Sequence, residues 1–431
     1  MLIEFSVENF RSARHRQTLS MVAAPRLWKK ETNTFLPDIA GEKNFPRLLK
    51  VAAIYGPNAS GKSTLVRAIG TLVSLINLKP SAEKGVLPVW PFRFDPELSD
   101  QPSRFDVHFV ANRTRYSFCL SATRERIVSE KLTVYEKGNG IDLYIREHIS
   151  DRDIYTINED RLIGGKALHN AWKNLTGPQV LFLSQAVANS SEELSQLKIP
   201  LEWLGRLAVV SPGMDAFASV TRRLVADIPH MGDVVAELLR DVDIPVSSIR
   251  STIIKNEVSD DAFGSVNISI GKESTDEFKA LRSKSKVETK LVHESSLGSA
   301  EFDFSEESDG TKSLIGFALP WASFLGVGNS IPKQITLVID ELDSSLHPKI
   351  IEALVKKLLD AKLQSQLIFT THDTHLMDTK LLRRDQIWLT ERDAAGATQL
   401  RSVHDFEGRE SEDVEKRYYE GRYRSLPFIK G

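Results

Sequence analysis

The most informative motif in this sequence is Gly56-Pro57-Asn58-Ala59-Ser60-Gly61-Lys62-Ser63-Thr64. It fits the pattern G-x-x-x-x-G-K-[ST] of a phosphate-binding loop, or P-loop. The residues before it, Lys50–Tyr55, are apolar on both faces and predict a buried parallel strand. The residues after it repeat apolar side chains at helical spacing from Leu65 to Ile76. The alternative, a chance turn rich in glycine and serine, would not require a strand before it and a helix after it. We therefore predict a strand, a P-loop and a helix.

The chemistry of this motif is specific. Its glycines let the backbone curl so that successive N–H groups face a phosphate, and the following helix adds its positive N-terminal end. In this pattern Lys62 reaches the β- and γ-phosphates of a nucleotide, and the Ser63 hydroxyl ligates magnesium. The sequence therefore predicts a site for a nucleotide and Mg²⁺.

A second motif places two acids after an apolar run, Leu337–Ile339. Asp340 stands at the carboxyl end of this predicted strand, where open α/β sheets bind their ligands. We predict that Asp340 holds the magnesium, directly or through a water, and that Glu341 polarises the attacking water. The alternative is that both are ordinary capping acids at the end of a strand.

Two further motifs lie near the carboxyl half of the chain. His372 follows the predicted strand Gln366–Phe369 and is expected to contact the γ-phosphate or to hold the catalytic water; a surface histidine is the alternative. Ser308 opens a predicted helix and is a reasonable N-cap. Alternatively, Ser308, Gly310 and the helix N-terminus bind the γ-phosphate of a nucleotide held by another subunit.

Composition excludes several classes of protein. Lys plus Arg total 56 against 58 for Asp plus Glu, which excludes a polycation, although a local basic patch stays open. The single cysteine, Cys119, excludes an internal disulfide and a cysteine-based zinc site, and we expect a reducing, cytoplasmic location. No signal peptide is recognised. The longest apolar stretch, 314–328, contains Pro320 and is too short to span a membrane, so we expect a buried helix there.

The pattern along the chain suggests three parts. Residues 1–135 begin with an alternating strand, contain the P-loop, and end in a predicted β-meander over 104–135. Residues 136–295 give mixed signals and are expected to form an accessory insertion outside the catalytic sheet; within them, Gly271–Lys290 is polar and predicts a mobile loop. Residues 296–431 alternate helix and strand, which predicts a parallel sheet flanked by helices.

The order of these motifs resembles the ABC-type ATPases. The opening strand followed by Asn9-Phe10-Arg11-Ser12 resembles the RecF/SMC-like branch. The tract Asp340–Pro348 is similar to the "DE-x-x-x-S-L-H-P" stretch of bacterial defence-island ATPases, a class that includes RloA, AriA of the PARIS system and PtuA of Septu. The tail, with Tyr419–Tyr423 and Leu426-Pro427-Phe428, also resembles that class.

This resemblance implies an α/β fold: an ABC-type P-loop ATPase head with a mixed sheet, a β-meander lobe and a mixed α/β insertion. It implies that ATP and Mg²⁺ are bound and that Glu341 is the general base, His372 the switch histidine, and Ser63 and Asp340 the magnesium ligands. Ser308 and Gly310 would be the signature that completes a partner's site, although Glu307–Thr311 differs from the transporter signature LSGGQ. The residues that would cradle the phosphates are Gly56, Pro57, Asn58, Ala59, Ser60, Gly61, Lys62, Ser63 and Thr64.

The same resemblance implies a Mg²⁺-dependent ATPase that forms a homodimer or a higher homo-oligomer through ATP-bridged heads. Its expected role is that of sensor or scaffold in an antiviral, toxin–antitoxin-like defence system against phage. Too few residues follow His372 for a Toprim domain, so a separate nuclease or Toprim-like effector is expected. A RecF-like, ATP-gated DNA clamp in repair shares every motif and stays open, as does nucleic-acid binding. A transporter subunit is disfavoured by the long insertion between P-loop and signature.

Overall fold

The computed structural model describes residues 1–78, 85–191, 196–210, 215–228, 230–254, 286–325, 335–344, 346–377 and 380–423. Most of the tract expected to be a mobile loop, up to residue 285, lies outside the described residues, and so does the tail motif Leu426-Pro427-Phe428. The last part of that tract, Lys286–Lys290, forms the start of a strand rather than a loop.

A six-stranded mixed sheet carries the P-loop. Its order is β11-β15-β16-β5-β17-β18, with every neighbouring pair parallel except the last, β17 and β18. The strands are β5 (Val51–Tyr55), β11 (Ala208–Val210), β15 (Thr336–Ile339), β16 (Gln366–Thr370), β17 (Ile387–Arg392) and β18 (Thr398–Ser402). The parallel sheet expected from strand–helix alternation is therefore present, and its helices are α2 (Lys62–Ile76), α10 (Asp309–Leu325) and α11 (Pro348–Asp360).

Alternation along β5 explains why this sheet is buried on both faces. Val51, Ala53 and Tyr55 contribute to a core shared with α10 and α11. Ala52 and Ile54 contribute to a second core, shared with α2 and the antiparallel sheet. Because successive side chains of a strand point to opposite faces, an apolar run of this kind joins two cores. The P-loop that follows β5 is thus fixed to the centre of the molecule.

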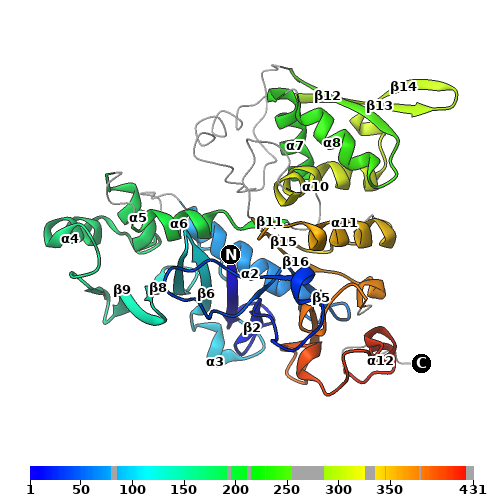
Figure 1. Cartoon of the computed structure of the whole chain (residues 1–431). Helices are drawn as coiled ribbons and strands as arrows, with labels where there is room; N and C mark the ends of the chain where they lie inside the picture. The colour runs from blue at the N-terminus through cyan, green and yellow to red at the C-terminus, as the bar shows by residue number, and fades with distance from the viewer. Residues whose placement is uncertain are drawn as a thin grey trace.

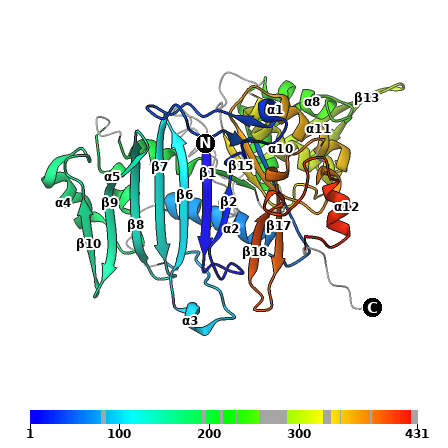
Figure 2. The same ribbon diagram turned by 60° about the horizontal axis from the view of Figure 1, so that its bottom comes forward.

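The antiparallel sheet has seven strands in the order β10-β9-β8-β7-β6-β1-β2, and Figure 2 shows it edge to edge beside β17 and β18. The strands are β1 (Leu2–Glu8), β2 (Gln17–Ser20), β6 (Ser103–Ala111), β7 (Thr114–Ala122), β8 (Ile127–Glu136), β9 (Asn139–Ile149) and β10 (Arg152–Ile157). The predicted meander over 104–135 is confirmed as β6, β7 and β8. It continues beyond residue 135, because β9 and β10 extend the same sheet.

A third unit stands on the outer side of α10 (Figure 1). Helices α7 (Asp215–Asp227) and α8 (Met231–Arg240) pack against α10 and against a three-stranded antiparallel sheet, β12-β13-β14. Its strands are β12 (Val246–Ile254), β13 (Lys286–Ser295) and β14 (Gly298–Asp303). The segment 136–295, expected to lie outside the catalytic sheet, also supplies β11 to that sheet, so it is not a separate insertion throughout.

The remaining described elements are short. They are α1 (Lys30–Asn33), β3 (Thr34–Phe35), β4 (Leu48–Leu49), α3 (Pro96–Ser99), α4 (Gly165–Leu175), α5 (Phe182–Ala188), α6 (Lys198–Gly205), η1 (Phe304–Glu306), η2 (Thr374–Met377), η3 (Arg384–Gln386), η4 (Val403–Asp405) and α12 (Val414–Tyr419). In the part of the chain described, we find no helix with the length and apolar character of a membrane span. The predicted fold class, an α/β head with a mixed sheet and a meander lobe, is confirmed.

Candidate nucleotide-binding site

Three predicted motifs meet at the carboxyl edge of the mixed sheet. The P-loop follows β5, Asp340 follows β15, and His372 follows β16, which lies between the other two strands. The strand register aligns the carboxyl ends of these three strands, since Ile339 pairs with Phe369 and Thr370 pairs with Ile54. Parallel sheets bind ligands at this edge.

Two glycines give the P-loop its shape. Gly56 has a φ of 147° and Gly61 a φ of 103°, a region that residues with a Cβ rarely adopt. A Cβ on Gly56 would lie 2.3 Å from Thr390 Oγ1, and one on Gly61 would lie 1.8 Å from Thr398 Oγ1. Both positions therefore require glycine for two independent reasons. Pro57, Asn58 and Ala59 form the turn between them, and Asn58 and Ala59 are exposed.

Side-chain hydroxyl groups from other segments of the chain hold the P-loop in place. Ser60 Oγ lies 2.5 Å from Thr390 Oγ1 of β17, and Thr398 Oγ1 of β18 donates to the Ser60 carbonyl at 2.9 Å. Ser12 Oγ lies 2.6 Å from Thr64 Oγ1 on the first turn of α2. The loop is thus preorganised by residues far away in the sequence.

Lys62 lies at the centre of the arrangement. Its side chain is buried, and its ammonium donates to the carbonyl oxygens of Gly56 at 2.8 Å and Pro57 at 3.1 Å. Burial lowers the pKa of Lys62 to about 8, while the carboxylates of Asp340, Asp343 and Glu341 act in the opposite direction. The P-loop lysine and the predicted acids therefore lie within electrostatic reach of one another.

Asp340 has one satisfied and one free carboxylate oxygen. The residue is 1% exposed; its Oδ1 accepts a hydrogen bond from Thr370 Oγ1 at 2.7 Å, and its Oδ2 is buried without a partner in the described structure. Glu341, half-buried, has the left-handed φ of 55°, and its backbone N–H donates to the same Thr370 hydroxyl at 2.7 Å. A buried free carboxylate oxygen is costly unless a ligand satisfies it.

The loop after β16 presents His372 to solvent. The His372 ring is exposed, and its backbone N–H donates to Asp343 Oδ2 at 2.9 Å. Asp373 Oδ1 accepts from the His375 ring at 2.7 Å, which raises the pKa of His375 above its ordinary value. The histidine loop is thus fixed by two aspartates at the sheet edge.

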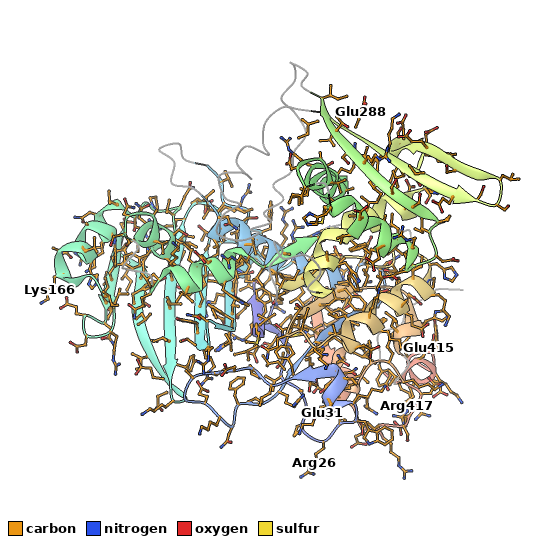
Figure 3. The ribbon with its side chains drawn as sticks, turned by 45° about the horizontal axis from the view of Figure 1, so that its top comes forward. Arg26, Glu31, Lys166, Glu288, Glu415 and Arg417 are labelled. Carbon is orange, nitrogen blue, oxygen red and sulfur yellow. The ribbon has the colours of Figure 1, made fainter. Side chains whose placement is uncertain are left out.

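The far side of this loop is tied to the carboxyl-terminal helix. Thr374 Oγ1 donates to Glu415 Oε1 at 2.5 Å and lies 3.0 Å from the Tyr419 hydroxyl. Both partners are on α12, where Figure 3 labels Glu415 beside Arg417. The predicted tail motif at Tyr419–Tyr423 therefore begins next to the histidine loop.

Ser308 directly precedes α10, and Gly310 lies in the first turn of that helix. Ser308 Oγ accepts from the Thr311 N–H at 3.1 Å, which is the N-cap role given as the alternative. Glu307, the residue before it, lies 2.7 Å from His293 Nε2 of β13. Among the described residues, no hydrogen bond joins Ser308 or Gly310 to the P-loop.

The donor set fits a magnesium nucleotide. Within the described ranges, no group of three or more His, Cys, Asp or Glu side chains could hold a metal alone. Magnesium bound with nucleotides typically takes only one or two protein oxygens, the rest coming from phosphate and water. Asp340 Oδ2, buried without a partner in the described structure, is one such oxygen, and Ser63 follows Lys62 on the first turn of α2.

Several residues that complete the site were not predicted. They are Ser12, Asp343, Thr370, Thr390 and Thr398. Two signals existed in the sequence: Ser12 belongs to the opening Asn9–Ser12 motif, and Thr370 stands at the strand end directly before the histidine motif. Thr390 and Thr398 carry no motif, and only the neighbouring positions of β5, β17 and β18 reveal them.

The fold brings a P-loop, a buried aspartate and a histidine loop to one edge of a mixed sheet, the arrangement of a P-loop nucleotide-binding protein. Residues 51–378 match the family described as "AAA domain, putative AbiEii toxin, Type IV TA system", and the chain belongs to that family. The match begins with β5 and ends beyond the histidine motif, so it includes every predicted site residue. No curated protein sequence matches the chain.

Solved structures with a similar course of the chain share little sequence with it. The SMC head domain from Thermotoga maritima is 14% identical, with a TM-score of 0.39, and the alignment covers 93% of this chain and 98% of that one. The recombination mediator protein RecF bound to ATP is 13% identical, with a TM-score of 0.39, covering 93% and 99%. An SMC head bound to the C-winged helix domain of ScpA is 12% identical, with a TM-score of 0.41, covering 97% and 99%.

Proposed function

We propose that this protein binds ATP with magnesium at the P-loop and hydrolyses it. The observation that carries the proposal is that Lys62 lies within electrostatic reach of a buried, half-satisfied Asp340 at the carboxyl edge of one parallel sheet, where β16 separates the strands that precede them. A cation for phosphate and a free carboxylate oxygen for a metal are what a P-loop ATPase needs. The family description, which names an AAA domain, supports the same activity.

The roles follow from the chemistry of each group. The P-loop N–H groups and Lys62 bind phosphate, and Ser63 and Asp340 would hold magnesium, which would neutralise phosphate charge. Glu341 accepts a proton from the attacking water as general base. His372, exposed on its anchored loop, contacts the γ-phosphate or orients that water.

A second subunit completes the site in this proposal. Ser308 and Gly310 stand at the N-terminus of the long helix α10, whose positive end favours an anion. They make no hydrogen bond to the P-loop of their own chain in the described structure. ATP bound at one head would therefore bridge to Ser308 of another, giving a homodimer or a higher assembly.

The biological role we propose is antiviral defence in the cytoplasm, with the ATPase controlling a separate effector protein. The family description names a toxin and a type IV TA system, which supports a role of this kind. The defence-island motif Asp340–Pro348 supports the same role. Because the chemistry of hydrolysis would be the same in a DNA clamp, the partner rather than the site distinguishes the two roles.

Two substitutions test the proposed activity. Glu341→Gln keeps an acceptor but cannot take a proton, so hydrolysis should fall roughly 10²–10⁴-fold while ATP binding survives. Lys62→Ala removes a charge-assisted phosphate contact worth about 1.5–3 kcal/mol, so binding should weaken severely in calorimetric titration with Mg-ATP. Normal turnover in Glu341→Gln, or normal affinity in Lys62→Ala, would remove the basis for these assignments.

The defence role has its own test. The gene is expressed with its genomic neighbours, cells are challenged with phage, and proteins bound to the tagged ATPase are identified. We expect protection by the wild type, loss of protection with Lys62→Ala, and an effector that co-purifies with Glu341→Gln. Normal protection by Lys62→Ala would contradict the ATP-dependent role.

A further inference from the structure

We propose that Thr370 is a positioning residue of this site and that its single hydroxyl sets the geometry of both acids, Asp340 and Glu341. The inference rests on the proposed ATPase function and assigns to Thr370 the selection of the metal-binding oxygen. Thr370 is 0% exposed and ends β16, the strand between β15 and β5.

The direction of the hydrogen bonds follows from elementary chemistry. A threonine hydroxyl has one proton to donate and lone pairs to accept with. The Glu341 N–H can only donate, so the bond of 2.7 Å between it and Thr370 Oγ1 uses a lone pair. The hydroxyl proton is then free for Asp340 Oδ1, also at 2.7 Å, and an ionised carboxylate can only accept it. The two bonds are therefore compatible in one orientation only.

In this orientation the two oxygens of the Asp340 carboxylate have different roles. Oδ1 is occupied by the Thr370 proton, whereas Oδ2 is buried and has no partner in the described structure. A carboxylate fixed at one oxygen cannot rotate freely to present the other in a different direction. Thr370 thus leaves a single, oriented oxygen for the metal, in the same way that neighbouring groups orient metal ligands in other proteins.

The same hydroxyl holds Glu341 in an uncommon backbone conformation. Glu341 has a φ of 55°, which is disfavoured for a residue with a Cβ. Its N–H finds an acceptor in Thr370 Oγ1, and the next residue, Leu342, donates its N–H to the Thr370 carbonyl at 3.0 Å. Thr370 therefore accepts from the first two N–H groups of the turn that begins at Glu341, and so places the proposed general base.

The neighbouring Thr371 offers a matched control. It is also 0% exposed, but its hydroxyl accepts from the N–H of Asp373 at 3.0 Å and makes no hydrogen bond with Asp340 or Glu341 in the described structure. Valine is close to threonine in shape and lacks the hydroxyl. Thr370→Val and Thr371→Val therefore remove the same group from adjacent buried positions, the last residue of β16 and the residue after it.

The experiment measures magnesium dependence and turnover separately. A fluorescent ATP analogue is titrated onto each variant with EDTA and then with increasing Mg²⁺, and ATPase rates are recorded over the same magnesium range. For Thr370→Val we expect unchanged binding in EDTA, an increase of about tenfold or more in the magnesium concentration for half-maximal tightening, and a fall in kcat of at least about tenfold, as expected for a lost bond to a charged group. Thr370→Ser, which keeps the hydroxyl, should be near wild type in both readouts, and Thr371→Val should keep the wild-type magnesium dependence.

The outcomes are distinguishable. If the wild type hydrolyses ATP and Thr370→Val shows wild-type magnesium dependence and kcat, the inference is overturned while the proposed function stands. If the wild type itself neither binds nor hydrolyses ATP, the proposed function fails first. Should Thr370→Val not fold, judged by circular dichroism, the pair Thr370→Ala and Thr370→Ser differs only by the hydroxyl; equal magnesium dependence in that pair would overturn the inference.

Discussion

The backbone N–H of His372 donates a hydrogen bond to Asp343 Oδ2 at 2.9 Å. Asp343 stands on the turn after β15, and His372 stands on the loop after β16, so this bond ties together the two loops that carry the proposed catalytic residues. Its acceptor is a carboxylate, which makes it one of the stronger kinds of hydrogen bond in proteins.

Replacing Asp343 with alanine should release the histidine loop. A hydrogen bond to a charged acceptor contributes about 1.5–3 kcal/mol. We therefore expect kcat for ATP hydrolysis to fall about tenfold or more, while the affinity for ATP changes little. Steady-state ATPase kinetics would show the separation of kcat from KM. Asp343→Asn retains an acceptor oxygen and should keep most of the activity; an unchanged kcat in Asp343→Ala would show that the loop needs no such anchor.

The lowered pKa of Lys62 predicts proton uptake on nucleotide binding. Burial lowers this pKa from 10.5 to about 8, so in mildly alkaline solution a fraction of the molecules carries a neutral Lys62 side chain. Bound phosphate favours the charged ammonium form. We expect calorimetric titrations above about pH 8, in two buffers of different ionisation enthalpy, to show uptake of a fraction of a proton. Lys62→Arg stays charged and should show none; equal uptake in both proteins would assign the proton to another group.

The same pKa gives a sign for stability. Because the folded pKa of Lys62 is lowered, the unfolded chain binds more protons between about pH 8 and 10.5, and the contribution of Lys62 to the free energy of unfolding should rise with pH in that window. Thermal unfolding of wild type and Lys62→Met across this range would show it. A difference between the two proteins that is independent of pH would contradict the lowered value.

Gly61 should not tolerate a methyl group. Its φ of 103° and the 1.8 Å approach of a Cβ to Thr398 Oγ1 predict that Gly61→Ala distorts the loop, with a strain cost of at least about 1–2 kcal/mol and severe loss of ATP binding. Gly177→Ala is the matched control, since a Cβ there meets no atom within 4 Å. Melting temperatures and ATP titrations compare the two, and equal behaviour would mean that the loop differs from the one described.

Subunit mixing tests whether Ser308 acts in trans. Ser308→Arg blocks the proposed signature, and Lys62→Ala blocks the P-loop, so each variant alone should be inactive. A mixed dimer regains one intact composite site, and activity should reappear on mixing. If exchange of subunits is confirmed by mass spectrometry and no ATPase activity returns, Ser308 is only the N-cap of α10, the role that its bond to the Thr311 N–H already shows.

Local pattern in the sequence was sufficient for the parts of this protein that depend on neighbouring residues. The spacing of residue types predicts the P-loop, the strand before it and the helix after it. Glycine, lysine and hydroxyl residues at these fixed offsets are specific to a phosphate-binding loop. The same holds for Asp340 and Glu341 after an apolar strand, and for the N-cap at Ser308. These features lie within a single turn or strand, where propensity and pattern act directly.

Tertiary structure decided what lies next to these motifs. Three features depend on strand pairing between distant segments: the place of β11 in the catalytic sheet, the extension of the meander by β9 and β10, and the place of β1 between β6 and β2. The hydroxyl of Thr370 reaches Asp340 only because parallel register sets Ile339 beside Phe369, and Thr398 reaches the P-loop only because β18 pairs with β17. Register is a property of two strands together, so neither strand's own sequence contains it.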